Sequence, residues 1–119
     1  MRIEWIVQDT IRILYVDFRG AENDDSYIAL MFQVLQKSRE SPGKFLALYN
    51  FQDVAFPPGI LEAIATFAKS NEINPVRAAF VGMSKINEKL LQKLDKFLSN
   101  KTERKLHQTE DEAKAWLIR

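Results

Sequence analysis

The chain has 119 residues, about one domain with a single core, and its 46% apolar and 28% charged residues are ordinary for a globular fold, so disorder is not expected. Seventeen basic and sixteen acidic side chains give a formal charge of +1, so no basic excess indicates a nucleic-acid partner. The sequence has no cysteine, which excludes disulfides and thiol chemistry, and no run approaches the roughly 18 apolar residues of a membrane span. We expect a single cytoplasmic domain over residues 1–119, without stable membrane insertion.

The first forty residues predict a β-hairpin followed by a helix. Apolar side chains recur at every second position of residues 3–7, and residues 11–18, after Asp9-Thr10, also have the composition of a strand. This pattern is typical of two strands joined by a tight turn. The second run is more apolar, so it should lie deeper in the sheet. A helix should begin at Asn23 or Asp24 and stop before Pro42. We expect its buried face to hold Tyr27, Met31, Val34 and Leu35.

The middle of the chain predicts a strand, a loop and a second helix. The nearly all-apolar run Phe45–Tyr49 suits a strand that is buried on both faces, which favours the centre of a parallel sheet. After Gly59 the apolar spacing becomes helical. The loop between them leaves the carboxyl end of a central strand, where open α/β sheets tend to bind other molecules.

The last part of the chain predicts two strands, residues 76–81 and 104–107, each followed by a helix. Ser84 is placed to cap the first of these helices. Thr109 and Glu112 have the spacing of a capping box, in which the hydroxyl and the carboxylate each accept a bond from the other residue's amide. We expect the first helix to bury Ile86, Leu90, Leu91, Leu94, Phe97 and Leu98, and the second to bury Ala113, Trp116 and Leu117.

This order of elements predicts the α/β class. Strands that alternate with helices imply a mostly parallel sheet with right-handed crossovers. We therefore expect a single layer of five strands with about four helices, in which the N-terminal strand is antiparallel.

Three segments carry a resemblance to a known superfamily. They are the buried strand that ends at Asn50, the run Ala78–Gly82 followed by a Lys-rich amphipathic helix, and the run Thr109–Ala113 that leads to Trp116. With them, residues 44–117 resemble the STAS-like (SpoIIAA-like) superfamily, the fold of bacterial anti-sigma factor antagonists and of the cytoplasmic tails of sulfate transporters. The chain is most similar to the small stand-alone bacterial members, described as STAS or CRAL-TRIO-like. The resemblance implies a regulatory, non-enzymatic domain.

The chain departs from this superfamily in the loop after the central strand. In the antagonists that loop carries an Asp-Ser-Ser-Gly-like motif whose serine is phosphorylated by a partner kinase. Here the corresponding segment 54–59 reads Val-Ala-Phe-Pro-Pro-Gly and holds no hydroxyl. We therefore expect the phosphorylation switch to be absent, while a partner surface at the same loop could remain.

A search by chemical type finds no catalytic group, metal site or cofactor motif. His107 is the only histidine, and the acidic residues gather where helix starts favour negative charge. Two alternatives stay open at the predicted carboxyl edge of the sheet. Gly82, Ser84 and Lys85 could bind an anion or form a plain helix cap. Tyr49, Asn50 and Asp53, with Gln52 and Arg19, could line a small-ligand pocket or only satisfy loop amides.

The favoured hypothesis is therefore an interaction domain that binds a protein partner through the loop after the central strand and the start of the helix that follows Gly59. Its contact residues would be Asn50, Phe51, Asp53, Phe56, Pro57, Pro58 and Gly59, with Phe51 and Phe56 exposed. The alternative is a small-molecule or lipid-binding module of the CRAL-TRIO type.

Two surface features add further hypotheses. Lys85, Lys89, Lys93 and Lys96 recur at helical spacing, which predicts a solvated face or a surface for an acidic partner. An exposed edge strand at residues 1–7, with Trp5, could pair with a second copy of the chain to form a homodimer.

Overall fold

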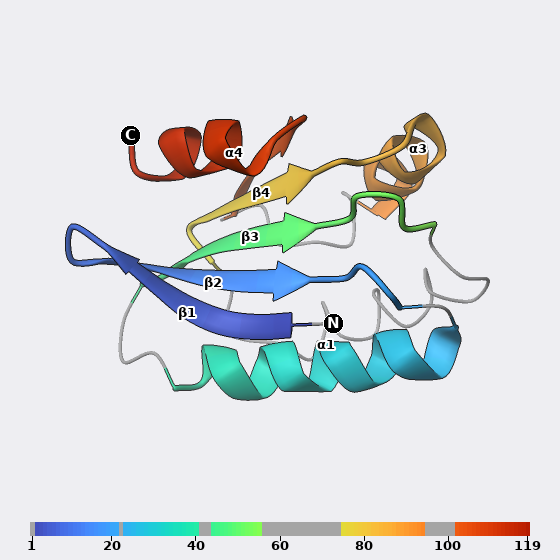
Figure 1. Cartoon of the computed structure of the whole chain (residues 1–119), viewed down its shortest axis with the longest axis horizontal. Coiled ribbons are helices and arrows are strands. Elements are labelled where there is room, and N and C mark those ends of the chain that lie inside the picture. Colours follow the sequence, from blue (N-terminus) through green and yellow to red (C-terminus); the bar gives the residue numbers. More distant parts are fainter. Residues whose placement is uncertain (1, 22, 41–43, 56–74, 95–101) are drawn as a thin grey trace.

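The computed structural model describes residues 2–21, 23–40, 44–55, 75–94 and 102–119. Its centre is one sheet whose strands lie side by side in chain order (Figure 1). The first two strands pair antiparallel, and each later pair is parallel. The expected mixed sheet with an antiparallel N-terminal strand is therefore confirmed. The five strands are β1 (Arg2–Gln8), β2 (Ile11–Asp17), β3 (Leu46–Asn50), β4 (Arg77–Val81) and β5 (Glu103–His107).

Helices cover both faces of this sheet. The described ranges contain three, namely α1 (Asp24–Ser38), α3 (Lys85–Leu94) and α4 (Glu110–Leu117). In Figure 1, α1 lies below the sheet and α4 above it, while α3 stands beyond the carboxyl ends of the strands. The fourth expected helix, after Gly59, falls outside the described residues, as do Phe97, Leu98 and Lys96.

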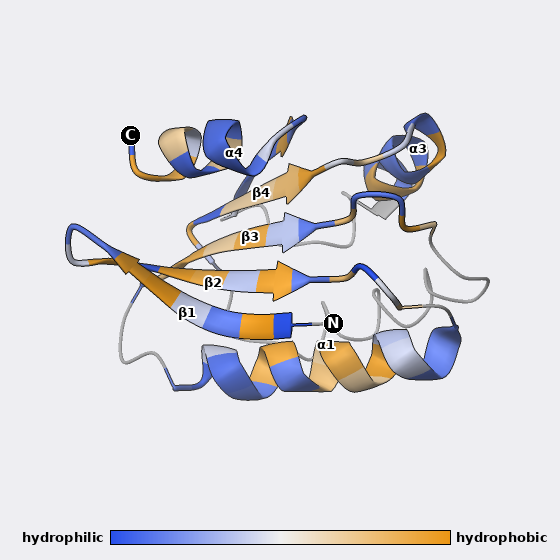
Figure 2. Ribbon diagram, viewed as in Figure 1, coloured by the Kyte–Doolittle hydropathy of each residue, from blue (hydrophilic) through white to orange (hydrophobic). Residues whose placement is uncertain are grey.

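The alternation of side chains along the strands produces two cores. On the α1 face, Leu14 and Val16 of β2 pack with Ala47 of β3 and with Tyr27 and Leu30 of α1. On the α4 face, residues of odd number in β2 and even number in β3 pack against Ala113, Trp116 and Leu117, the three residues expected to be buried by the last helix. Figure 2 shows the apolar colour concentrated in β2, β3 and β4, with hydrophilic colour at the carboxyl ends of β2 and β3.

Local sequence accounts for where the elements begin and end. Asp9 and Thr10 both have left-handed backbone, with φ of 52° and 70°, as a two-residue hairpin turn requires. Asn23 caps α1 and accepts a bond from Ser26 N, and Thr109 caps α4 by accepting from Glu112 N. Three of the predicted caps are therefore formed, because Ser84 Oγ likewise accepts from Asn87 N at 3.1 Å.

One prediction about a buried face needs correction. Ile86 was expected in the apolar stripe of α3 but is 72% exposed, and the side chain that turns inward is the polar Asn87 at 1% exposure. Asn87 is accommodated because its Nδ2 donates to Val54 O at 2.7 Å. Trp5 of the edge strand is partly buried, since its ring packs on Phe45 and its Nε1 donates to Glu40.

The lysines of α3 lie as expected where they are described: Lys85, Lys89 and Lys93 are all exposed. Among the described helices, none is long and apolar enough to cross a membrane.

Candidate functional site

The carboxyl ends of β2, β3 and β4 meet at one edge of the sheet, on the right in Figure 1. Asp17 and Asn50 are register partners across β2 and β3, and Asn50 pairs in turn with Val81. Residues in register point to the same face of a sheet. This row lies on the face that α4 covers, since Val81 belongs to the core under that helix.

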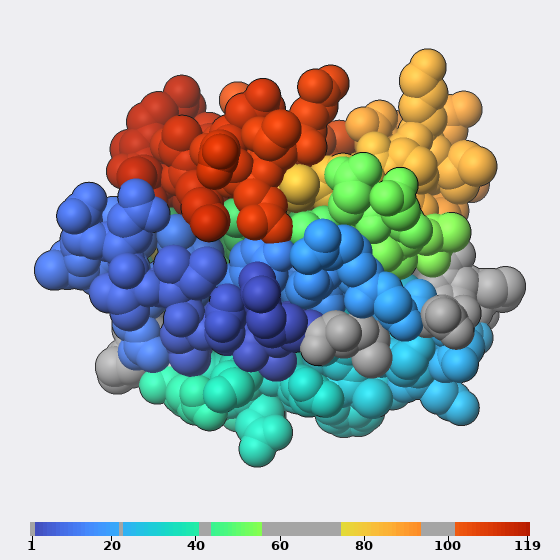
Figure 3. Space-filling model, viewed as in Figure 1, coloured from blue at the N-terminus to red at the C-terminus, as the bar shows by residue number. Residues whose placement is uncertain are grey.

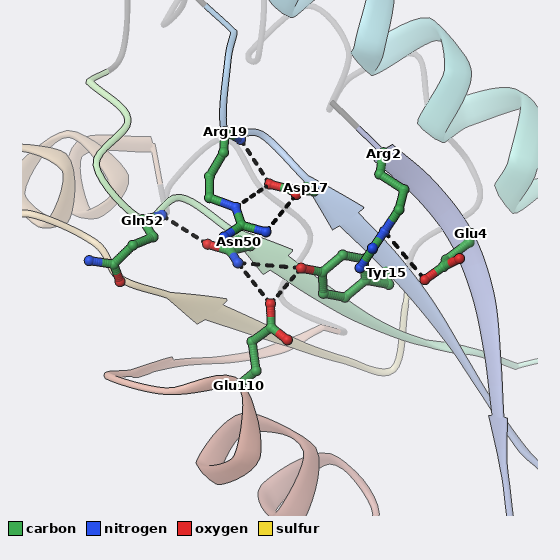
Figure 4. Close-up of polar contacts among 8 residues, drawn as sticks. All are labelled: Arg2, Glu4, Tyr15, Asp17, Arg19, Asn50, Gln52 and Glu110. Atoms are coloured by element: carbon green, nitrogen blue, oxygen red, sulfur yellow. Dashed lines mark hydrogen bonds and ion pairs between the residues drawn. The ribbon is translucent and has the colours of Figure 1, made fainter.

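A buried polar cluster joins this row to α4, as Figure 4 shows. Tyr15 Oη donates to Glu110 Oε1 at 2.5 Å, and Asn50 Nδ2 donates to the same carboxylate oxygen at 2.8 Å. Asn50 Nδ2 also lies 3.3 Å from Tyr15 Oη. Burial, and then the bond to Glu110, raises the pKa of the Tyr15 hydroxyl above its usual value. The cluster therefore fixes the first turn of α4 to the two central strands.

An Asp17–Arg19 pair lies beside this cluster (Figure 4). The Arg19 guanidinium donates to both carboxylate oxygens of Asp17, each at 2.9 Å, and the Arg19 amide donates to Oδ1 at the same distance. These bonds from Arg19 lower the pKa of Asp17 below its usual value. The Arg2 guanidinium lies 4.7 Å from the centre of the Tyr15 ring and forms an ion pair with Glu4. Two cations thus flank the buried cluster.

The loop after β3 is held by backbone contacts on both sides. Asn50 Oδ1 accepts from Gln52 N at 2.9 Å, and Phe51 N donates to Val81 O at 2.8 Å. Asp53 has left-handed backbone, with φ of 58°. Gly82, with φ of 74°, lies so close to this loop that a Cβ there would be 2.8 Å from Gln52 Cα. Gly82 is therefore required for the close approach of the two loops, a structural reason that needs no bound anion.

The expected exposure of Phe51 is wrong. Its side chain is 5% exposed and stacks on Phe18 with the ring centres 4.4 Å apart, because the chain turns inward directly after β3. Phe51 is therefore an internal anchor of the loop. The exposed residues of the loop are Gln52, Asp53 and Ala55, while Phe56, Pro57, Pro58 and Gly59 lie outside the described residues.

Tyr49 and Asn50, which the sequence predicts to line one pocket, lie on opposite faces of the sheet. Tyr49 points to the α1 face, where its ring packs against Phe18 and Phe80, and burial raises the pKa of its hydroxyl to about 12. It therefore lies on the opposite side of the sheet from Asn50. Ser84 acts as the cap of α3, and Lys85 beside it is exposed.

His107 occupies the end of the same row, in register with Val81. Both of its ring nitrogens are buried without a hydrogen-bond partner, and its ring lies 5.4 Å from that of Trp116. Burial, and then the charge of Lys105, lowers the pKa of His107 below its usual value. The imidazole thus sits in a setting that favours its neutral form.

Three residues of this region were not predicted from the sequence: Tyr15, Asp17 and Glu110. The signal available was the position of Asp17, a carboxylate at the end of an otherwise apolar run, just as Asn50 ends the next run. Glu110 was interpreted only as a favourable charge at a helix start. No group of three or more His, Cys, Asp or Glu side chains in the described ranges could hold a metal ion.

Comparison with known proteins gives a match to a family model. The model described as SpoIIAA-like matches residues 13–118, nearly the whole chain. The comparisons with curated proteins and with solved structures gave no match. The matched range begins within β2 and runs past the end of α4, so it includes the central strand and the loop after it. The chain therefore belongs to the SpoIIAA-like family.

Proposed function

We propose that this protein is a non-enzymatic regulatory domain that binds a protein partner through the loop after β3, together with the adjoining first turn of α3. Membership of the SpoIIAA-like family supports a regulatory or interaction role. The observation that carries the proposal is a braced loop with exposed side chains at the carboxyl edge of the central strand. Asn50 and Phe51 brace the loop from inside, so the contacts themselves fall to residues that face solvent.

The loop and the first turn of α3 form one continuous surface. Asn87 Nδ2 donates to Val54 O at 2.7 Å, which ties the helix to the loop. Gln52, Asp53 and Ala55 of the loop are exposed, and so is Ile86, which precedes Asn87 in α3 and is 72% exposed. Figure 3 shows the loop, in green, next to the yellow start of α3. We call these four exposed residues the edge surface.

The edge surface suits a protein more than a small ligand. An exposed apolar side chain within a polar rim is typical of a protein contact. A braced loop loses little conformational freedom when a partner binds, so more of the contact energy appears as affinity. Since residues 50–59 contain no Ser, Thr or Tyr, the proposed binding does not depend on phosphorylation of this loop.

A capture experiment with matched variants tests the proposal. The bait variants are Ile86→Asp and Asp53→Asn, which change the edge surface without disturbing the fold. Aspartate is favourable in the first turn of a helix, and asparagine tolerates the left-handed backbone of residue 53. Val7→Asp is the control, because Val7 is 66% exposed at the far end of the sheet, on β1.

We expect the wild type and the Val7→Asp control to retain the same protein from a source-cell lysate, and Ile86→Asp to lose it. Purified partner should then bind wild type with an affinity at least about tenfold higher than the Ile86→Asp variant, since one buried apolar side chain contributes about 1.5–3 kcal/mol and about 1.4 kcal/mol corresponds to a factor of ten. Phosphatase treatment of the bait should change nothing. Equal binding by all four baits, the wild type, the control and both edge-surface variants, would refute the edge surface as the contact region.

A second copy of the chain is a separate candidate partner. β1 forms an outer edge of the sheet, so its outward backbone groups could pair with another strand. Light scattering at several concentrations tests this, and a constant monomer mass would exclude it.

A further inference from the structure

The structure contains an open groove at the opposite end of the sheet from the edge surface. Its volume is about 560 Å³, and the hairpin turn, the amino ends of β3 and β4 and the end of α4 line it. Figure 3 shows the hairpin and the C-terminal helix side by side at this end, on the left. We call it the amino-edge groove. It is independent of the partner surface proposed above.

The floor of the amino-edge groove is apolar. Leu46 and Ile118 are partly buried at the margin of the core under α4, and Leu117 belongs to that core at 2% exposure. Val76 adds a side chain that is 39% exposed, next to Phe45. The groove thus gives access to the end of a hydrophobic core, where an apolar group would leave water.

The charged side chains that line the groove are all basic. Arg12, Lys44, Arg77 and Arg119 all line it, and none of the lining residues is acidic. Arg77 is already engaged, because its Nη1 donates to Trp116 O and Arg119 O, each at 3.2 Å, and its Nε lies 3.6 Å from Glu103. Arg77 therefore satisfies carbonyl groups at the C-terminal end of α4 and forms one side of the groove.

The other three cations have no acidic partner among the ion pairs formed by the described residues. Arg12 lies over the uncharged ring of Trp5, with 4.4 Å between the guanidinium carbon and the ring centre. Lys44 and Arg119 supply two further positive charges at the groove. An apolar floor with unneutralised cations complements a molecule that has an apolar body and an anionic head.

The volume of the groove favours a small molecule over a protein as its occupant. Its volume falls within the roughly 300–1,000 Å³ of small-molecule sites, whereas a stable protein contact needs about 800 Å² from each partner. We propose that the amino-edge groove binds a free, small amphipathic carboxylate, whose chain lies on Leu46, Val76 and Leu117 and whose carboxylate meets Lys44 and Arg119.

Octanoate and its neutral counterpart 1-octanol are suitable probes. Each is titrated into ¹⁵N-labelled protein at low salt, and amide shifts are followed by NMR. Octanoate should produce saturable shifts at Leu46, Val76 and Leu117. The double variant Lys44→Gln, Arg119→Gln should bind octanoate about fivefold more weakly, as expected for two partly exposed charge contacts. Its binding of octanol should be unchanged.

Two further variants keep the test decisive. Lys85→Gln, Lys89→Gln removes the same charge from α3, outside the groove, and should bind octanoate like the wild type. Val76→Trp fills the groove and should abolish binding of both probes, while amide shifts elsewhere show that the fold is intact.

Three results would overturn the proposal. The first is the absence of saturable shifts with octanoate, and the second is equal binding of octanol and octanoate with no effect of the Lys44 and Arg119 changes. The third is sedimentation with phosphatidylglycerol vesicles without any response to free octanoate, which would identify a membrane surface as the source of the anion. None of these results bears on the edge surface.

Discussion

Replacement of Phe51 by alanine provides the sharpest test of how the loop after β3 is held. The side chain is 5% exposed and stacks on Phe18 at 4.4 Å, with the Phe80 ring 6.2 Å away. A buried Phe→Ala change costs about 3–5 kcal/mol, to which loss of the stacked ring contributes about 0.5–1.5 kcal/mol. We expect the free energy of unfolding to fall by about 4 kcal/mol, a large share of the roughly 5–15 kcal/mol of a typical domain.

Urea denaturation followed by far-UV circular dichroism measures this loss. With a slope of about 2 kcal/mol per molar urea, the midpoint should move down by about 2 M while the slope stays constant. Ile86→Ala is the matched control, because an apolar side chain that is 72% exposed should change stability by no more than about 0.5 kcal/mol. A loss below 1 kcal/mol for Phe51→Ala, or equal losses for the two variants, would refute the assignment of Phe51 as an internal anchor.

Three further predictions concern the same edge of the sheet. Gly82→Ala should destabilise the fold by about 1–3 kcal/mol in the same assay, because it combines left-handed backbone with a Cβ 2.8 Å from Gln52 Cα. A double-mutant cycle of Tyr15→Phe and Glu110→Ala should give a coupling of about 1–2 kcal/mol, and a coupling near zero would contradict the 2.5 Å bond. For His107, the pKa is lowered on folding from 6.5, so the unfolded chain binds the proton more readily and stability should decline as pH falls through 6.5. His107→Phe should flatten that decline, and an unchanged slope would contradict it.

The elements that the sequence predicts well are those set by local pattern. Alternation in residues 3–7 and the apolar run 45–49 are visible without any tertiary information, and both form strands. The caps Asn23, Ser84 and Thr109 are also local, because each hydroxyl or amide meets a backbone group three residues along the chain. Pattern and propensity therefore agree with the fold at these positions.

The site is less predictable because its contacts are distant in sequence. Tyr15 and Glu110 are 95 residues apart, and nothing near either residue indicates the other. Dependence on distant contacts also explains why the exposure of Phe51 and of Ile86 differs from the expectation. Phe51 is buried because its ring stacks on Phe18, a residue distant in sequence. Ile86 is exposed because its neighbour Asn87 points inward and donates to Val54 O.

The geometry of Asn50 changes what its place at the carboxyl edge implies. Asn50 is 4% exposed. Its side-chain Nδ2 donates to Glu110 and lies close to Tyr15 Oη, and its side-chain Oδ1 accepts from Gln52 N. A side chain satisfied in this way has little capacity left for a partner. Asn50 therefore holds the position of the loop, since the same side chain joins α4 to Gln52. If the edge surface binds as proposed, we expect a change that loosens the first turn of α4 to shift this loop through Asn50, which contacts both Glu110 and Gln52.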